Sequence, residues 1–183
     1  MLLERARQEL PLTETAASGG RPLLARLAGQ ALPSAELPST SDQPVNLAEV
    51  ERGVVYFYPG HLCSPENGYD SPPLDDAQHQ AFADHWSDFT ALNCHAFGVS
   101  SQTRDEQRAI AGALGLGHPL LSDVDTQLAH ELGLPIFTVA HISWYCRVTL
   151  IVSNGLVAHA FYPVTSAIRS PAQAIAWMRR QWH

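Results

Sequence analysis

The middle of the chain alternates between apolar runs of strand length and amphipathic stretches of helix length. The first clear run is residues 53–58, where β-branched and aromatic side chains follow one another up to Pro59 and Gly60. An unbroken run of this length is typical of a strand that is buried on both faces of a sheet. Residues 61–73 are rich in Gly, Pro, Asn, Ser and Asp. They predict a long loop at the end of a central strand, a common place for functional residues.

A helix is expected from Leu74 to Thr90, because Phe82, Trp86 and Phe89 recur at helical spacing. The same alternation continues to the end of the chain. The further predicted elements are a strand at 94–100, a helix opened by the capping box at 103–106 and ended at Gly115, a strand at 119–121, a helix ended at Gly133, strands at 147–153 and 156–162 joined by the hairpin signal Asn154-Gly155, and a helix from Ser170 to Trp182.

This order of elements predicts an α/β fold. Alternating strands and helices followed by an antiparallel hairpin indicate a mixed sheet with helices on both faces, the layout of a thioredoxin-like domain. Residues 1–33 hold two apolar-periodic stretches, 2–10 and 23–32, and are predicted to form a helical N-terminal extension. Prolines at 33, 38 and 44 mark an extended entry segment. The main domain is therefore assigned to residues 34–183.

Composition limits the partners and the compartment. The chain has 183 residues, of which 45% are hydrophobic, and a formal net charge of −7. It has no basic run that would neutralise phosphates, so neither a nucleic acid nor a membrane is expected as a partner. No segment approaches the ~18 apolar residues of a membrane span, and charged residues interrupt the first apolar ones. We therefore expect a cytoplasmic protein.

Cysteine and histidine are the residues with candidate chemistry. The three cysteines, Cys63, Cys94 and Cys146, are widely and irregularly spaced, which fits neither a disulfide framework nor a zinc motif. Histidines and aspartates gather between positions 61 and 85. However, His79 and His85 are six residues apart and do not share a helix face as an i, i+4 pair would. We expect no metal and no cofactor.

Five segments of the sequence resemble those of one known family. They are Leu37-Pro38-Ser39-Thr40-Ser41-Asp42-Gln43-Pro44-Val45-Asn46-Leu47, Val54-Val55-Tyr56-Phe57-Tyr58-Pro59-Gly60, Phe97-Gly98-Val99-Ser100, Pro119-Leu120-Leu121-Ser122-Asp123 and Arg147-Val148-Thr149-Leu150-Ile151-Val152. These segments are similar to the peroxiredoxins, in particular to their alkyl hydroperoxide reductase and thiol-specific antioxidant branch. They follow in family order over residues 35–183. The resemblance implies a peroxiredoxin-type thioredoxin-like fold, a hydroperoxide substrate and a homodimer.

The resemblance ends at the family's catalytic motif, Pro-x-x-x-Thr-x-x-Cys. Counted from Pro59, this motif places Cys63 at the Thr position and Glu66 at the Cys position. A second register, which allows a longer insertion in the loop, places Asp75 at the Cys position instead. In a third register, residues 63–66 (Cys-Ser-Pro-Glu) resemble a thioredoxin Cys-Gly-Pro-Cys motif that keeps only its first cysteine. The sequence leaves these three registers open.

Cys63 and Arg147 are the leading candidates for catalysis. Cys63 follows a central strand, where a helix N-terminus and backbone N–H groups can stabilise a thiolate. The resemblance implies that Arg147 lies beside the thiolate, favours its ionised form and holds the peroxide oxygens. Pro59 would shield the sulfur, and Glu66 would accept a proton or stand in place of a second thiol. The structural alternatives are a buried or loop thiol of ordinary acidity for Cys63 and a surface ion pair at a strand end for Arg147.

Three functional hypotheses follow. The first is a thiol-dependent peroxidase in which Cys63 becomes a sulfenic acid and an external thioredoxin- or glutaredoxin-like thiol restores it. Cys94 and Cys146 are interpreted as packing residues, which is why the reductant must be external. The second hypothesis is a catalytically degenerate peroxiredoxin-like scaffold with a binding or regulatory role. The third is a remodelled pocket that uses Asp75, Asp76 and the histidines for non-redox chemistry.

Overall fold

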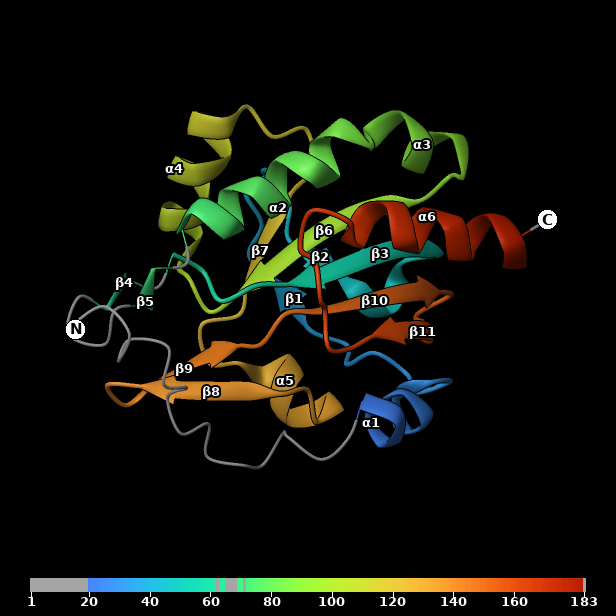
Figure 1. Ribbon diagram of the computed structural model, residues 1–183, viewed down its shortest axis with the longest axis horizontal. Helices are drawn as coiled ribbons and strands as arrows, with labels where there is room; N and C mark the ends of the chain where they lie inside the picture. The colour runs from blue at the N-terminus through green and yellow to red at the C-terminus, as the bar shows by residue number, and fades with distance from the viewer. Residues whose placement is uncertain (1–19, 62, 65–68, 71, 183) are drawn as a thin grey trace, which may run out of the picture.

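The computed structural model describes residues 20–61, 63–64, 69–70 and 72–182, and Figure 1 shows their arrangement. The main sheet has five strands in the order β11-β10-β3-β6-β7. The strands are β3 (Arg52–Phe57), β6 (His95–Ser100), β7 (Leu120–Ser122), β10 (Val148–Ser153) and β11 (Leu156–Phe161). The pairs β3–β6 and β6–β7 are parallel, whereas β10 is antiparallel to both β3 and β11. The sheet is therefore mixed and β3 lies at its centre, as predicted.

Helices cover both faces of the sheet, because the side chains of β3 alternate between two apolar cores. Val54 and Tyr56 face one core, Val55 and Phe57 face the other, and all four are fully buried. Figure 1 shows the two helical layers on opposite sides of the sheet. The first layer is α2 (Pro72–Asp84), α3 (Trp86–Ala91), α4 (Arg104–Leu114) and α6 (Ser170–Gln181), and the second is α1 (Gly20–Leu27) and α5 (Gln127–Leu132). No helix within the described ranges is long and apolar enough to cross a bilayer.

Three short strand pairs and one short helix lie outside the main sheet. They are β1 (Glu36–Leu37) with β2 (Val45–Asn46), β4 (Cys63–Ser64) with β5 (Tyr69–Asp70), β8 (Ile136–Val139) with β9 (Ile142–Tyr145), and the 3₁₀ helix η2 (Leu47–Glu49). The β8–β9 hairpin was not predicted. Its turn consists of Ala140 and His141, which both have positive φ (51° and 67°). Hairpin turns with positive φ normally contain Asn or Gly, and this turn contains neither, so the sequence does not indicate it.

The segment between α1 and β2 runs along both edges of the main sheet. At the β11 edge, Ala31 bridges Leu156, and the Gly29 N–H donates to the Val157 carbonyl at 2.8 Å. At the β7 edge, Ser39 forms a bridge with Leu121. Residues 29–40 therefore cover both edge strands of the sheet.

Two predicted helices have different bounds in the structure. The helix expected at 23–32 is α1, which ends at Leu27 and is followed by Gly29 with φ +81°. Its residues Leu23 and Leu27 pack into the core. The helix expected at 2–10 lies outside the described residues, and the division at residue 33 remains a prediction. The single helix expected over 74–90 is two helices, α2 and α3, and Trp86 is 42% exposed rather than part of a continuous apolar face.

Gly155 is required by the β10–β11 turn. It has φ +70°, and a Cβ atom added there would collide with the carbonyl oxygen of Ala48. We expect Gly155→Ala to lower the free energy of unfolding by more than about 1 kcal/mol, as measured by urea denaturation. Gly112→Ala is the matched control, because Gly112 lies within α4 with open space around it. That change should stabilise the protein by about 0.5–1 kcal/mol, and equal effects at the two positions would contradict this account.

Candidate functional site

The carboxylate of Asp75 is the centre of a buried polar site at the carboxyl end of β3. Asp75 lies in the first turn of α2 and has no exposed surface. Its Oδ2 atom accepts hydrogen bonds from the backbone N–H groups of Gly60 at 3.1 Å and His61 at 2.8 Å. Its Oδ1 atom accepts from Arg147 Nη2 at 2.5 Å. One carboxylate therefore receives donors from a loop and from a strand end that are far apart in the sequence.

The pairing of β3 with β10 brings Arg147 to this site. Val148 is paired with Phe57 in the antiparallel register, so the preceding residue, Arg147, lies next to the end of β3, where the loop to α2 begins. The Arg147 side chain is 12% exposed, and its Nη1 atom donates to Gln78 Oε1 at 2.5 Å. Arg147 thus contacts two residues of the first two turns of α2. The ion pair ties α2 to the sheet.

A layer of aromatic and imidazole side chains lies next to this ion pair. The hydroxyl of Tyr56 is 2.8 Å from His79 Nδ1 and 2.7 Å from His118 Nε2. His79 follows Asp75 by one helical turn and packs edge-on against Tyr58, with ring centroids 4.5 Å apart. Burial lowers the pKa of His79 to about 3, with further contributions from His118, His61 and Arg147, and burial lowers that of His118 to about 4. Both imidazoles are therefore neutral at physiological pH.

His61 is held by two neighbouring aspartates. The backbone N–H of His61 donates a hydrogen bond to Asp75, and the ring atom Nε2 of His61 lies 2.9 Å from Asp76 Oδ1. The residue has φ +48°, a left-handed conformation that is uncommon outside glycine. Its side chain is 29% exposed and that of Asp76 is 39% exposed. His61 is thus a partly accessible imidazole with a defined position next to the Asp75 site.

The four residues predicted for catalysis are described unequally. Arg147 and the loop containing Pro59 meet at the Asp75 carboxylate, and Pro59 itself is buried. The backbone of Cys63 lies in β4, paired with Asp70, two residues beyond His61. The side chain of Cys63 and the whole of Glu66 lie outside the described residues. The roles predicted for all four residues, Cys63, Arg147, Pro59 and Glu66, stay predictions.

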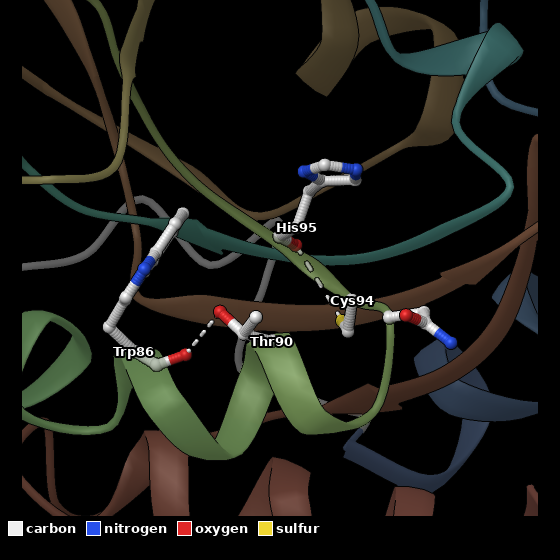
Figure 2. A pocket seen from close by; sticks show the side chains of 5 residues that line it. Trp86, Thr90, Cys94 and His95 are labelled. Atoms are coloured by element: carbon white, nitrogen blue, oxygen red, sulfur yellow. Dashed lines mark hydrogen bonds between the residues drawn. The ribbon is translucent and has the colours of Figure 1, made fainter.

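The other two cysteines lie in environments that suppress ionisation. Cys94 is 5% exposed and lies just before β6, at the amino-terminal end of that strand. Because β6 is parallel to β3, this end is opposite the Asp75 site. Burial raises the pKa of its thiol to about 12 despite the opposing effect of Arg52, and burial raises that of Cys146 to about 11. Figure 2 shows Cys94 in the wall of a cavity of about 230 Å³, with its sulfur directed to the His95 carbonyl. Neither thiol is a ready nucleophile.

Sequence reasoning missed several members of the site. Gln78, Tyr56 and His118 were not singled out, and His79 was considered only as a metal ligand or as one of the histidines of a remodelled pocket. The available signal was the i, i+4 spacing of Asp75 and His79, which places both on one face of a helix that follows a central strand. In the described part of the chain, no three His, Cys, Asp or Glu side chains are grouped so as to hold a metal ion.

Comparison with solved structures defines the class of fold. Peroxidoxin BcpB from Mycobacterium tuberculosis is 20% identical, with a TM-score of 0.70 over 84% of this chain and 96% of that one. A cysteine-to-serine mutant of PrxQ from Xylella fastidiosa is 18% identical, with a TM-score of 0.71 over 85% and 97%. Enterococcus faecalis AhpC is 19% identical, with a TM-score of 0.69 over 85% and 92%. The fold is therefore the peroxiredoxin-type thioredoxin-like fold that the sequence predicted.

Sequence comparison gives the family. The model of the AhpC/TSA family matches residues 28–160, and the chain belongs to this family. Two relatives, both named as peroxiredoxins and found in two strains of Mycobacterium tuberculosis, are 31% identical over 107 residues, which cover 57% of this chain. The matched region spans 62% of the length of these relatives. The peroxiredoxin resemblance of the sequence is confirmed.

The structure also bears on the three registers of the catalytic motif. Asp75, which the second register placed at the position of the family's cysteine, has the partners that were expected for the sulfur. These partners are the guanidinium of Arg147 and the backbone N–H groups of Gly60 and His61. In this chain a carboxylate fills the positively polarised position.

Proposed function

We propose that this chain is a thiol-dependent peroxidase in which Cys63 is the reacting residue. Family membership supports the class of reaction, since its relatives are named as peroxiredoxins. The choice of sulfur is carried by the burial of the other two cysteines: Cys94 is 5% exposed and Cys146 is half-buried, and burial raises the pKa of their thiols to about 12 and about 11. Cys63 is the remaining cysteine, and its strand follows the 59–61 loop directly.

The proposed cycle needs a partner thiol. A hydroperoxide oxidises Cys63 to a sulfenic acid, which an external thioredoxin- or glutaredoxin-like dithiol then reduces. Cys94 is poorly placed to resolve this sulfenic acid, because it lies at the amino-terminal end of β6, whereas the 59–61 loop follows the carboxyl end of the parallel strand β3. We further propose that the protein acts in the cytoplasm as a homodimer.

A second function is favoured by the Asp75–Arg147 pair. Arg147 donates a hydrogen bond from Nη2 to Asp75 Oδ1 and another from Nη1 to Gln78 Oε1. Both terminal nitrogens of the guanidinium are therefore bonded within the protein. A site closed in this way suits a member of the family that has lost peroxidase activity and serves as a binding or regulatory scaffold. Under this alternative, Cys63 is an ordinary thiol.

Replacement of Cys63 separates the two functions. We expect Cys63→Ser to lower the rate of hydroperoxide consumption, measured with dithiothreitol as reductant, by about two orders of magnitude or more, because the nucleophile is lost. Cys146→Ser and Cys94→Ala are the matched controls and should retain the wild-type rate. Full activity of Cys63→Ser would overturn the assignment of this sulfur. A wild-type protein that consumes no peroxide would favour the scaffold.

A further inference from the structure

The β8–β9 hairpin is separate from the main sheet. Within the described residues its two strands pair only with each other, from Ile136 opposite Tyr145 to Val139 opposite Ile142. Figure 1 shows them, in orange, as a pair of strands outside the main sheet. A two-stranded hairpin is at best marginally stable in water, and it gains stability from a further strand or from packing. Contact with another chain would therefore stabilise this hairpin.

The base of the hairpin is anchored in the protein, whereas its tip is exposed. Tyr145, at the end of β9, is fully buried, and its hydroxyl donates a hydrogen bond to Asp123. The centroid of its ring lies 5.0 Å from that of Phe57. At the other end of the hairpin, Val139 is paired with Ile142 next to the turn, and Ile142 is 54% exposed. The core thus fixes the base of the hairpin while an apolar side chain at its tip faces solvent.

The turn of the hairpin is also unfavourable in the isolated chain. Ala140 and His141 are exposed and have φ values of 51° and 67°. Left-handed backbone at residues other than glycine costs free energy and persists where surrounding contacts enforce it. Contacts from a neighbouring chain would add to those that hold this turn.

The edges of the hairpin differ from those of the main sheet. Native proteins keep edge strands from pairing with other chains by placing charged residues or prolines on them, or by covering them. Residues 29–40 cover both edges of the main sheet. Residues 136–145, by contrast, contain no Asp, Glu, Lys, Arg or Pro, and no third strand joins them in the described part of the chain. The hairpin is therefore the place where strand pairing with another chain is least opposed.

The charge of the protein favours a second copy of the chain as the occupant. Each copy has a formal net charge of −7, so two copies repel each other over most of their surfaces. In a twofold interface a residue near the axis faces its own counterpart, and a charged side chain there would meet a like charge. The two residue pairs next to the turn, Val139–Ile142 and Thr138–Ser143, carry no charge. A basic partner would instead be attracted to the acidic surface of the protein.

We propose that two copies of this chain associate through their β8–β9 hairpins, around a twofold axis near Val139 and Ile142. This inference gives the proposed homodimer its contact surface and rests on that part of the proposed function. Antiparallel pairing of the two hairpins forms a four-stranded sheet across the interface and covers Ile142 of each copy.

Sedimentation velocity over a series of protein concentrations tests this proposal. We expect Ile142→Asp to raise the Kd of the dimer at least about tenfold, because the new carboxylate faces its own counterpart across the axis. Ile168→Asp is the matched control. Ile168 is 58% exposed and lies outside the hairpin, before α6, so this change adds the same charge and should leave the Kd unchanged. Urea denaturation of the dilute proteins checks that both variants fold.

Hydrogen exchange locates the contact without a substitution. Because pairing protects backbone amides, we expect exchange in residues 136–145 of the wild-type protein to slow as its concentration rises. Exchange that does not depend on concentration in a protein that does dimerise would contradict the proposal. Hairpin amides that become protected only when thioredoxin is added would assign this surface to the reductant and overturn the proposal.

The outcomes separate the interface from the rest of the proposed function. A wild-type protein that is monomeric at every concentration would overturn both the interface and the homodimer. A dimer that Ile142→Asp leaves intact would overturn the interface alone. An equal loss of dimer in Ile168→Asp would also contradict the interface, because it would indicate a general effect of added negative charge. The peroxidase assignment is tested separately, by the rate of peroxide consumption in Cys63→Ser.

Discussion

Arg147→Met is expected to lower the free energy of unfolding by about 3–5 kcal/mol. The substitution keeps most of the aliphatic side chain but removes the guanidinium that pairs with the buried carboxylate of Asp75. The two N–H groups of Gly60 and His61 would still donate to Asp75, yet neither carries a full positive charge. Removing one partner of a buried ion pair destabilises a protein because the other charge stays buried without compensation, whereas replacing both partners by apolar residues is often nearly neutral. The double variant Asp75→Leu/Arg147→Met should therefore recover part of the lost free energy of unfolding.

A surface ion pair provides the matched control. Arg179 and Asp88 are 2.6 Å apart, with side chains 58% and 40% exposed. Because water and salt screen this pair, Arg179→Met should change the free energy of unfolding by less than about 1 kcal/mol. Denaturation in urea at low and high salt gives both values. If Arg147→Met were as mild as Arg179→Met, the ion pair would not be the contact that holds α2 on the sheet.

Lowering the pH from 7 to 5 is expected to destabilise the protein by about 4 kcal/mol through His79 and His118 alone. Both have folded-state pKa values, about 3 and about 4, that lie below the ordinary value of 6.5. At pH values between the ordinary pKa of 6.5 and these folded-state pKa values, the unfolded chain binds protons that the folded protein does not. Stability is therefore complete above pH 6.5 and is lost as the pH falls. The solution at pH 5 is 1.5 pH units below the ordinary histidine pKa of 6.5. For each of the two histidines this difference corresponds to about 2 kcal/mol of unfolding free energy.

His118→Gln tests the origin of this pH dependence. Glutamine can still hydrogen-bond to the Tyr56 hydroxyl but does not titrate, so its effect at pH 7.5 measures the structural cost of the substitution. With that value as baseline, the loss of stability between pH 7 and 5 should fall by about 2 kcal/mol. An unchanged slope of unfolding free energy against pH would show that the acid sensitivity comes from other groups.

The helices and strands that could be predicted are those marked by residues close together in the sequence. The capping box of Thr103 and Glu106 opens α4 as predicted, and Asn154-Gly155 forms the turn between β10 and β11. The β8–β9 hairpin was missed because its turn residues, Ala140 and His141, adopt positive φ although neither is the Asn or Gly typical of such turns. The break between α2 and α3 was missed because the helical spacing of apolar residues continues across His85.

The candidate site was less predictable, since its contacts are long-range. Arg147 was identified through the resemblance to the peroxiredoxins, but its pairing with Asp75 joins residues 72 positions apart in the sequence. A carboxylate in the first turn of a helix is ordinarily a solvent-exposed group that favours the helix N-terminus. Only the register of β10 against β3 shows that an arginine lies next to it and that it can be fully buried.

Residues 29–40 also determine how this protein can meet other chains. By bridging Leu156 on one side of the sheet and Leu121 on the other, they occupy backbone groups that a free edge strand would offer to a foreign strand. Where this segment lies against the edge strands, their backbone groups are therefore not available for pairing with another chain. We expect removal of this segment to expose unpaired backbone groups on both edge strands and so to favour intermolecular β-pairing.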